Sequence, residues 1–186
     1  MGRIEELADR YRCHIGAPWQ HNLAGDQKAI FVVYPKTDER KLRARLELFE
    51  MATTSAGHGW RALDLTDTFA RWMADADYRD EYFSDPDALA TGPKSPFTKF
   101  AAEQLRKALM ADEAGEDVVV AVLGAASFFG LTYLSAILSK VKNDIRGRLV
   151  LFFPGEFDNN TYRLLDARDG WNYLAVPITL HNGVKD

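Results

Sequence analysis

The segment from Leu149 to Pro177 carries the side chains that protein surfaces use to recognise other molecules. It holds four carboxylates, two arginines and three large aromatic residues between two apolar runs. Arginine forks pair with carboxylates, and aromatic rings offer a large contact area at low conformational entropy. The mixture therefore predicts a partner-binding surface, whose candidate residues are Arg163, Arg168, Trp171, Asn172 and Tyr173. The alternative is a long loop that is ordered by its own ion pairs and turns.

The tryptophans divide into two groups by their surroundings. Trp19 and Trp171 lie in polar contexts, so both are candidates for contact with a partner. Trp72 falls on the apolar side of an expected helix and is predicted to lie in the core.

A possible phosphate-binding turn follows the apolar run that ends at Leu123. There a strand runs into Gly124, a group of small residues and Gly130, where backbone N–H groups and a helix N-terminus would face an anion. A P-loop also requires a lysine directly after its second glycine, and here Leu131 follows instead. Two phenylalanines fill the turn. A degenerate nucleotide-binding or phosphotransfer domain that uses the Gly124–Gly130 turn thus remains only an alternative.

Other patterns of catalytic or metal-binding residues are weak. The four histidines are far apart, with no HExxH pair and no C-x-x-C motif, so we expect no metal and no cofactor. Asp64 and Asp67 lie near the carboxyl end of an expected strand, where open α/β sheets bind ligands. We favour the simpler interpretation, in which Asp67 caps a helix and Asp64 lies on the polar side of the strand. Glu156 and Asp158 are expected to order the Asn159–Asn160 turn. No catalytic residue is assigned, and the chain is not expected to be an enzyme.

The composition argues against binding to nucleic acids. The 186 residues include 23 basic and 27 acidic ones, which gives a formal net charge of −4 and an isoelectric point near 5.6. Electrostatic binding to DNA or RNA requires a basic face on the protein surface. A small local basic patch is still compatible with this charge, such as the run Arg40–Arg45, but a solvated helix face is the favoured interpretation of that run.

The sequence indicates a cytoplasmic protein. Cys13 is the only cysteine, so no intramolecular disulfide can form, as is usual in a reducing compartment. The N-terminal residues are charged throughout and lack the apolar stretch of a signal peptide. The apolar run Val118–Leu134 is too short and too broken to span a membrane.

Apolar runs and helical periodicities alternate along the chain. This pattern predicts a single α/β domain, 1–186, with a mostly parallel sheet of about four to five strands and helices on both faces. Residues 1–25 are expected to form a helix and a loop, residues 78–96 a loop, and residues 182–186 a frayed tail. The expected strands are Ala29–Tyr34, Trp60–Leu65, Val118–Leu123, Arg148–Phe153 and Tyr173–Ile178. The expected helices are Ile4–Arg12, Glu39–Thr54, one through Phe69 and Trp72, Phe97–Met110 and Leu131–Val141.

A family resemblance is carried by five blocks that cover nearly the whole chain, in order. They are RIEEL near the start, PWQHNLAG at 18–25, DERKLRARLELFE at 38–50, AGHGWRALDLTDTFARWMA at 56–74 and DIRGRLVLFFPGEFDNNTYRLLDARDGWNYLAVPI at 144–178. In these blocks the chain resembles the BrxB family, a small component of BREX phage-defence systems.

The resemblance implies a role in bacterial antiviral defence. BREX systems methylate host DNA to mark it as self and block the replication of unmarked phage. Their other members include a phosphatase-like protein (PglZ), a large ATPase (BrxC) and a methyltransferase (PglX). The family implies no catalytic residues, so we expect a non-enzymatic subunit that binds other members, with PglZ as the favoured partner and BrxC and PglX as further ones.

Overall fold

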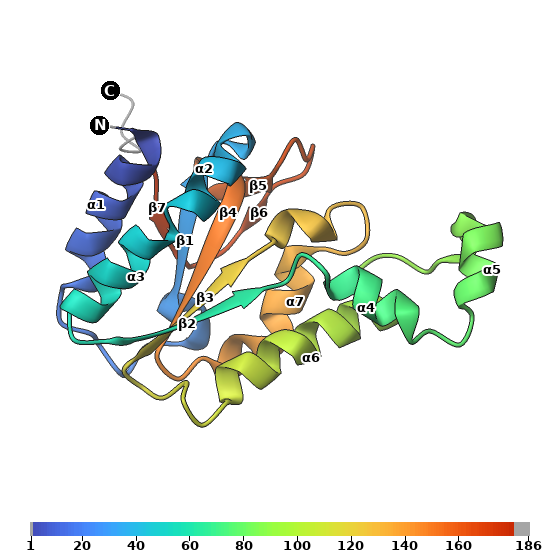
Figure 1. Cartoon of the computed structure of the whole chain (residues 1–186), viewed down its shortest axis with the longest axis horizontal. Coiled ribbons are helices and arrows are strands. Elements are labelled where there is room, and N and C mark those ends of the chain that lie inside the picture. Colours follow the sequence, from blue (N-terminus) through green and yellow to red (C-terminus); the bar gives the residue numbers. More distant parts are fainter. Residues whose placement is uncertain (1, 181–186) are drawn as a thin grey trace.

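Five parallel strands form the centre of the molecule, in the order β2-β3-β4-β1-β7 (Figure 1). The computed structural model describes residues 2–180. β4 lies in the middle and pairs with β3 on one side and with β1 on the other. The strands are β1 (Ala29–Tyr34), β2 (Gly59–Asp64), β3 (Val118–Leu123), β4 (Arg148–Asp158) and β7 (Val176–Ile178).

The central strands form where apolar, β-branched residues follow one another without interruption. All six residues of β1 are buried, as are five of the six in β3 and the first seven of β4. Strands that are covered on both faces have this continuous pattern instead of an alternating one. The predicted α/β class with a mostly parallel sheet is therefore confirmed. β2 is the exception, because it is an edge strand with largely exposed residues.

Helices cover both faces of the sheet (Figure 1). On one face, α1 (Arg3–Ile15) and α3 (Leu46–Ser55) pack over β1 and β4. In α1 the residues Ile4, Leu7, Tyr11 and Ile15 recur at three- and four-residue spacing and are all buried, as an amphipathic helix requires. On the other face, α6 (Pro96–Met110) and α7 (Leu134–Val141) pack over the same strands, and α4 (Thr68–Ala74) contacts α6.

The helices differ from the predicted ones at several places, and α1 runs to Ile15 instead of ending at Arg12. The helix expected over Glu39–Thr54 is interrupted at Arg45, which separates α2 (Glu39–Ala44) from α3. α7 begins at Leu134 rather than Leu131, because the N–H groups of Leu131 and Thr132 both donate to the Phe128 carbonyl in a turn. The expected loop 78–96 contains a short helix, α5 (Arg79–Ser84). Short 3₁₀ helices are η1 (Gly25–Lys28), η2 (Lys36–Asp38), η3 (Pro86–Ala88), η4 (Ala125–Phe128) and η5 (Lys142–Asp144).

The sheet is larger than the four to five strands expected. β4 does not end at Phe153 but continues to Asp158, and two antiparallel strands follow, β5 (Thr161–Leu164) and β6 (Trp171–Asn172). The final parallel strand starts at Val176, three residues later than predicted. The frayed tail expected at 182–186 lies outside the described residues.

In the turn after β3, alanine substitutions at two glycines are expected to differ in how much they destabilise the protein. Gly124 (φ +83°) packs so closely that an added Cβ would lie 2.5 Å from the Thr66 nitrogen, whereas nothing lies within 4 Å of a Cβ at Gly130 (φ +78°). The left-handed conformation costs alanine about 1–2 kcal/mol, and overpacking adds about 1–3 kcal/mol. We expect Gly124→Ala to lower the free energy of unfolding by roughly 2–5 kcal/mol and Gly130→Ala by only about 1–2 kcal/mol, measured by urea unfolding. Equal losses would contradict the close packing of this turn.

Candidate interaction surface

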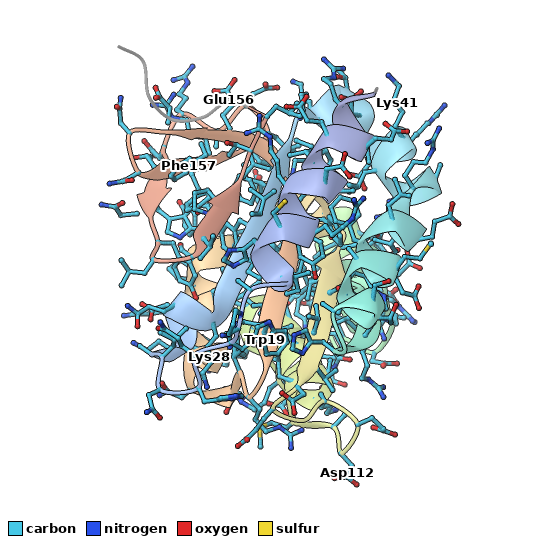
Figure 2. The ribbon with its side chains drawn as sticks, turned by 90° about the vertical axis from the view of Figure 1, so that its left-hand side faces the viewer. Trp19, Lys28, Lys41, Asp112, Glu156 and Phe157 are labelled. Carbon is cyan, nitrogen blue, oxygen red and sulfur yellow. The ribbon has the colours of Figure 1, made fainter. Side chains whose placement is uncertain are left out.

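The extension of β4 forms a hairpin with β5 at one end of the sheet. Two residues, Asn159 and Asn160, connect the strands, and both have positive φ angles (48° and 58°), as in a type I′ turn. Asparagine tolerates this conformation, which explains why the predicted Asn159–Asn160 turn forms here. Figure 2 shows Glu156 and Phe157 on the hairpin, at the end of the molecule opposite to Asp112.

An aromatic cluster supports the inner face of the hairpin. Tyr162 is fully buried and its ring lies 4.6 Å from that of Phe157 and 5.9 Å from that of Trp171, measured between centroids. The Tyr162 hydroxyl donates to the Ala175 carbonyl at 2.9 Å. Trp171 also contacts Phe31 in β1, at 6.2 Å between centroids. Because an isolated hairpin is marginally stable in water, these contacts are what hold it in place.

Most of the predicted aromatic candidates therefore face inward. Trp171 and Tyr173 are half-buried, and Tyr173 stacks on Phe31 at 5.4 Å between centroids. Burial raises the pKa of the Tyr173 hydroxyl to about 12, so the group stays protonated at neutral pH. The packing of these two rings therefore supports the hairpin. Only the exposed part of each ring is accessible to a partner.

The polar candidates on the same segment point outward. Arg163, Arg168 and Asn172 are exposed. Neither arginine forms an ion pair within residues 2–180, whereas the neighbouring Asp166 pairs with Lys36. The structure thus divides the predicted set into an anchored aromatic layer and an exposed polar layer. The two guanidinium groups have no acidic partner among the described residues. They are therefore the groups on this surface that are best suited to bind a partner.

Trp19 does not join this surface, because it lies near the opposite end of the sheet (Figure 2). Its ring stacks on His58 at 3.7 Å between centroids, and the guanidinium carbon of Arg148 lies 4.6 Å from the ring centroid. Its indole N–H donates to the Ile15 carbonyl at 3.2 Å. Trp19 thus stays a separate candidate for contact with a partner, since intramolecular stacking holds it at the amino edge of the sheet, away from the hairpin.

Arg148 controls the electrostatics of that amino edge. Its side chain is buried, with the two terminal nitrogens donating to the carbonyls of Gly147 and Gln20 at 3.1 and 3.0 Å. Burial, together with the positive charge of Arg148, lowers the pKa of His14 below its ordinary value. The same two causes, burial first, lower the pKa of His58, although Asp117 partly opposes them. Both histidines are consequently held neutral.

A polar network missed by sequence reasoning joins α2 to the carboxyl end of β2. Arg43 donates to Asp64 at 2.6 Å, to Thr66 at 3.0 Å and to Glu39 at 2.7 Å. Partial burial would raise the pKa of Asp64, but hydrogen bonds from Arg43 and Thr66 lower it to about 2. Tyr34 donates to the same Glu39 carboxylate. An aspartate that stays ionised holds the two elements together and is poorly suited to carry a proton in catalysis.

Asp64 and Asp67 were expected to have ordinary structural roles. Asp64 is indeed exposed at the end of β2, but it is bound to Arg43 rather than only to solvent. Asp67 occupies the N-cap position of α4, yet its side chain makes no capping hydrogen bond. The sequence did indicate that Asp64 lies at the carboxyl edge of a parallel sheet. It could not indicate the pairing with Arg43, because Arg43 lies 21 positions earlier and no local pattern links the two residues.

The Gly124–Gly130 turn uses its own backbone donors. The N–H groups of Ser127, Phe129 and Leu131 all donate to carbonyls within the turn, at 3.0–3.1 Å. Phe128 is fully buried beneath it. A phosphate-binding loop needs such N–H groups free to face the anion. The contacts therefore favour a structural turn over the nucleotide-binding alternative.

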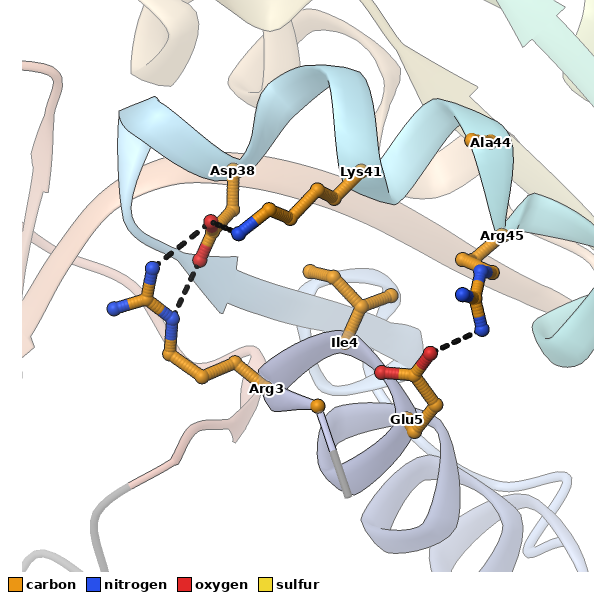
Figure 3. Close-up of a pocket in the computed structure, with 8 residues that line it drawn as sticks. Arg3, Ile4, Glu5, Asp38, Lys41, Ala44 and Arg45 are labelled. Atoms are coloured by element: carbon orange, nitrogen blue, oxygen red, sulfur yellow. Dashed lines mark hydrogen bonds and ion pairs between the residues drawn. The ribbon is translucent and has the colours of Figure 1, made fainter.

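A shallow cavity of about 220 Å³ lies between α1 and α2 (Figure 3). Asp38, which is almost fully buried, pairs with Arg3 at 2.7 Å and with Lys41 at 3.3 Å, and Arg45 pairs with Glu5. The hydrogen bond from Arg3 is the main cause that lowers the pKa of Asp38. The basic side chains that line the cavity thus form ion pairs with carboxylates, and the cavity is part of the contact between α1 and α2.

Two further observations concern metal sites and membranes. Within residues 2–180, no group of three or more His, Cys, Asp or Glu side chains is arranged to hold a metal ion. Over the same residues, no helix combines the length and the apolar character needed to cross a bilayer.

The lowered pKa values of His14 and His58 predict a pH-dependent stability. Because unfolded histidines have a pKa of about 6.5, the unfolded chain binds more protons than the folded one below that pH. The contribution is fully present well above pH 6.5, begins to fall near that pH, and is lost as the pH drops through the lower pKa values that the two histidines have in the folded state. We expect the free energy of unfolding to be lower at pH 5.5 than at pH 7.5, and this difference to shrink in His14→Gln/His58→Gln. The exposed His21 is the control: His21→Gln should keep the full difference, and an unchanged difference in the double variant would contradict the assignment.

The engaged N–H groups of the Gly124–Gly130 turn predict no response to nucleotides. A ligand at a hundred times its dissociation constant stabilises the folded state by about 2.7 kcal/mol, which a melting curve detects readily. We expect ATP and GTP with magnesium to leave the melting temperature unchanged. A dose-dependent rise with either nucleotide, abolished by a bulky substitution at Ser127, would revive the nucleotide-binding alternative.

Comparison with known proteins returns no similar chain: none of the protein-family models, curated proteins or solved structures compared with it gives a match.

Proposed function

We propose that this protein is a non-enzymatic assembly subunit of a bacterial antiphage defence complex of the BREX type. It works by binding other members of the complex in the cytoplasm, with PglZ as the first partner and BrxC and PglX as further ones. The support is twofold: the sequence blocks that resemble BrxB along nearly the whole chain, and a surface suited to protein recognition. The role requires no bond-making step by this chain.

The observation that carries the proposal is a pair of exposed arginines, one on the supported hairpin and one just after it, that form no ion pair with the described residues. Arg163 stands opposite Glu156 in the β4–β5 register, and Arg168 lies in the connection to β6. Both are exposed and lack a carboxylate partner within the described residues. Interface energy concentrates at arginines and aromatic residues that a rigid surface presents, so these two positions are expected to be hot spots.

Rigidity favours this hairpin over other exposed parts of the chain. The outer part of β4 continues into the hairpin directly from the buried part of the same strand, and Tyr162 and Trp171 pack on the inner face of the hairpin. A surface that is already ordered loses little further entropy when a partner binds. The partner surface should carry carboxylates, because each free guanidinium presents a planar fork of donors.

Loss of the two arginines should weaken binding to PglZ without unfolding the protein. We expect Arg163→Ala/Arg168→Ala to raise the dissociation constant by roughly 10- to 100-fold, since truncated hot spots cost about 2 kcal/mol or more. The melting temperature should stay within about 1 °C of the original, because exposed substitutions change stability by less than about 0.5 kcal/mol. Trp171 is left intact because its ring packs on Tyr162 and Phe31.

The matched control removes two positive charges elsewhere. Lys99 and Lys107 are exposed on α6, so Lys99→Ala/Lys107→Ala changes the net charge equally and should bind like the original protein. Interferometry with immobilised PglZ measures all three proteins. Equal affinities of the hairpin variant and the original would contradict the role of the hairpin, and failure of the original protein to bind PglZ, BrxC or PglX would contradict the proposed function.

A further inference from the structure

The segment 75–91 projects from the body as an arm. It leaves the end of α4, forms α5 and η3, and returns to α6, and Figure 1 shows α5 standing apart from the sheet and its covering helices. None of its residues is buried. At the returning end, the Gly92 N–H donates to the Leu131 carbonyl at 3.0 Å, which anchors the arm to the body.

Contacts with the body do little to order this arm. Its side-chain hydrogen bonds are local: Arg79 donates to the Ala74 carbonyl and Ser84 to the Asp80 carbonyl, at 3.0 and 2.9 Å. The ring contact with the body is made by Tyr82, which stacks on Trp72 at 6.3 Å between centroids. A helix of six residues is marginal in water without tertiary packing. The arm therefore has little packing against the body to stabilise it.

Two large aromatic side chains on the arm point to solvent. Tyr78 is 60% exposed and Phe83 is 67% exposed, the highest value among the exposed large hydrophobic residues of the described chain. Phe83 directly follows Tyr82, whose ring contacts Trp72 in α4, and Tyr78 precedes Tyr82 by four residues. Aromatic residues at the tip of a projecting element act as anchors that fill apolar pockets of a partner.

The arm also concentrates the negative charge of the protein. It contains six of the 27 acidic residues but only one of the 23 basic ones, so the remainder of the chain is nearly neutral. Arg79 is that one basic residue, and it pairs with Asp80 at 3.7 Å. The acidic residues are Asp75, Asp77, Asp80, Glu81, Asp85 and Asp87.

We propose that the arm docks into a basic groove of a partner protein, with Phe83 and Tyr78 filling an apolar pocket in its floor. The proposal rests on the assembly function above and adds a second contact surface to it. The charge of the arm indicates the kind of partner. A segment with a net charge of about −5 repels the phosphates of nucleic acids and anionic lipid headgroups, and it attracts lysine and arginine side chains. The free arginines of the hairpin suit an acidic partner surface, so the two surfaces recognise different chemistry.

The test compares two variants with equal changes of charge, each of which also loses one large exposed hydrophobic side chain. The arm variant is Asp80→Asn/Glu81→Gln/Phe83→Ala. The control variant is Asp112→Asn/Glu116→Gln/Met51→Ala, made at exposed positions away from the arm. Binding to purified PglZ, BrxC and PglX is measured separately at several salt concentrations. Circular dichroism and melting temperature should be unchanged in both variants.

The expected result is specific to the arm variant. It should bind one of the three partners roughly tenfold more weakly than the original, with a shallower salt dependence, while the control variant binds as the original does. A charge reversal, Asp80→Lys/Glu81→Lys, should reduce that binding further.

The other outcomes separate the two proposals. Unchanged binding of the arm variant to every partner of the original protein overturns the docking proposal and leaves the assembly function standing. No binding of the original protein to any of the three overturns both. A change only in self-association, measured by analytical ultracentrifugation, shows that a second copy occupies the arm and overturns the choice of a different protein.

Discussion

Burial of β4 between two helical layers is the constraint on which the rest of the structure depends. The strand pairs with β1 and β3, and its first seven residues are buried. The same strand then leaves the sheet and forms one side of the hairpin, so the exposed surface there is continuous with the core. Tyr162 and Trp171 complete this link, because they pack against Phe31 in the neighbouring strand β1. A polar surface that would be mobile in a free loop is thereby held in one geometry.

Charge is arranged differently in the body and at its periphery. Most ionic groups in the body are used internally: Arg43 holds Asp64 at the end of β2, and Asp38 joins α1 to α2. Buried Arg148 stacks on Trp19 at the amino edge, where burial, with the charge of Arg148 as a smaller cause, lowers the pKa of His14 and His58. At the periphery, the hairpin presents arginines without carboxylate partners within the described residues, and the α5 arm presents an excess of acids. This separation is what an adaptor with two unlike contact surfaces requires.

The sequence predicted the buried part of the fold well and the exposed part poorly. β1 and β3 have the predicted bounds, because strands covered on both faces are continuous apolar runs. The hairpin was missed as strands because β5 and β6 are short and mix charges with aromatic residues. The inward packing of Trp171 depends on Phe31, 140 positions earlier, and no local pattern reports such a contact. The stacking of Trp19 on His58 is likewise non-local, so its polar neighbours in sequence suggested exposure to a partner.

Hydrogen exchange of the protein alone and in complex with PglZ tests the central claim most directly. If the chain acts by binding through the hairpin, the amides of 155–172 exchange more slowly in the complex, while those of β1 and β3 are unchanged because they are already protected. Exchange rates that are the same with and without PglZ throughout 155–172 would contradict the account.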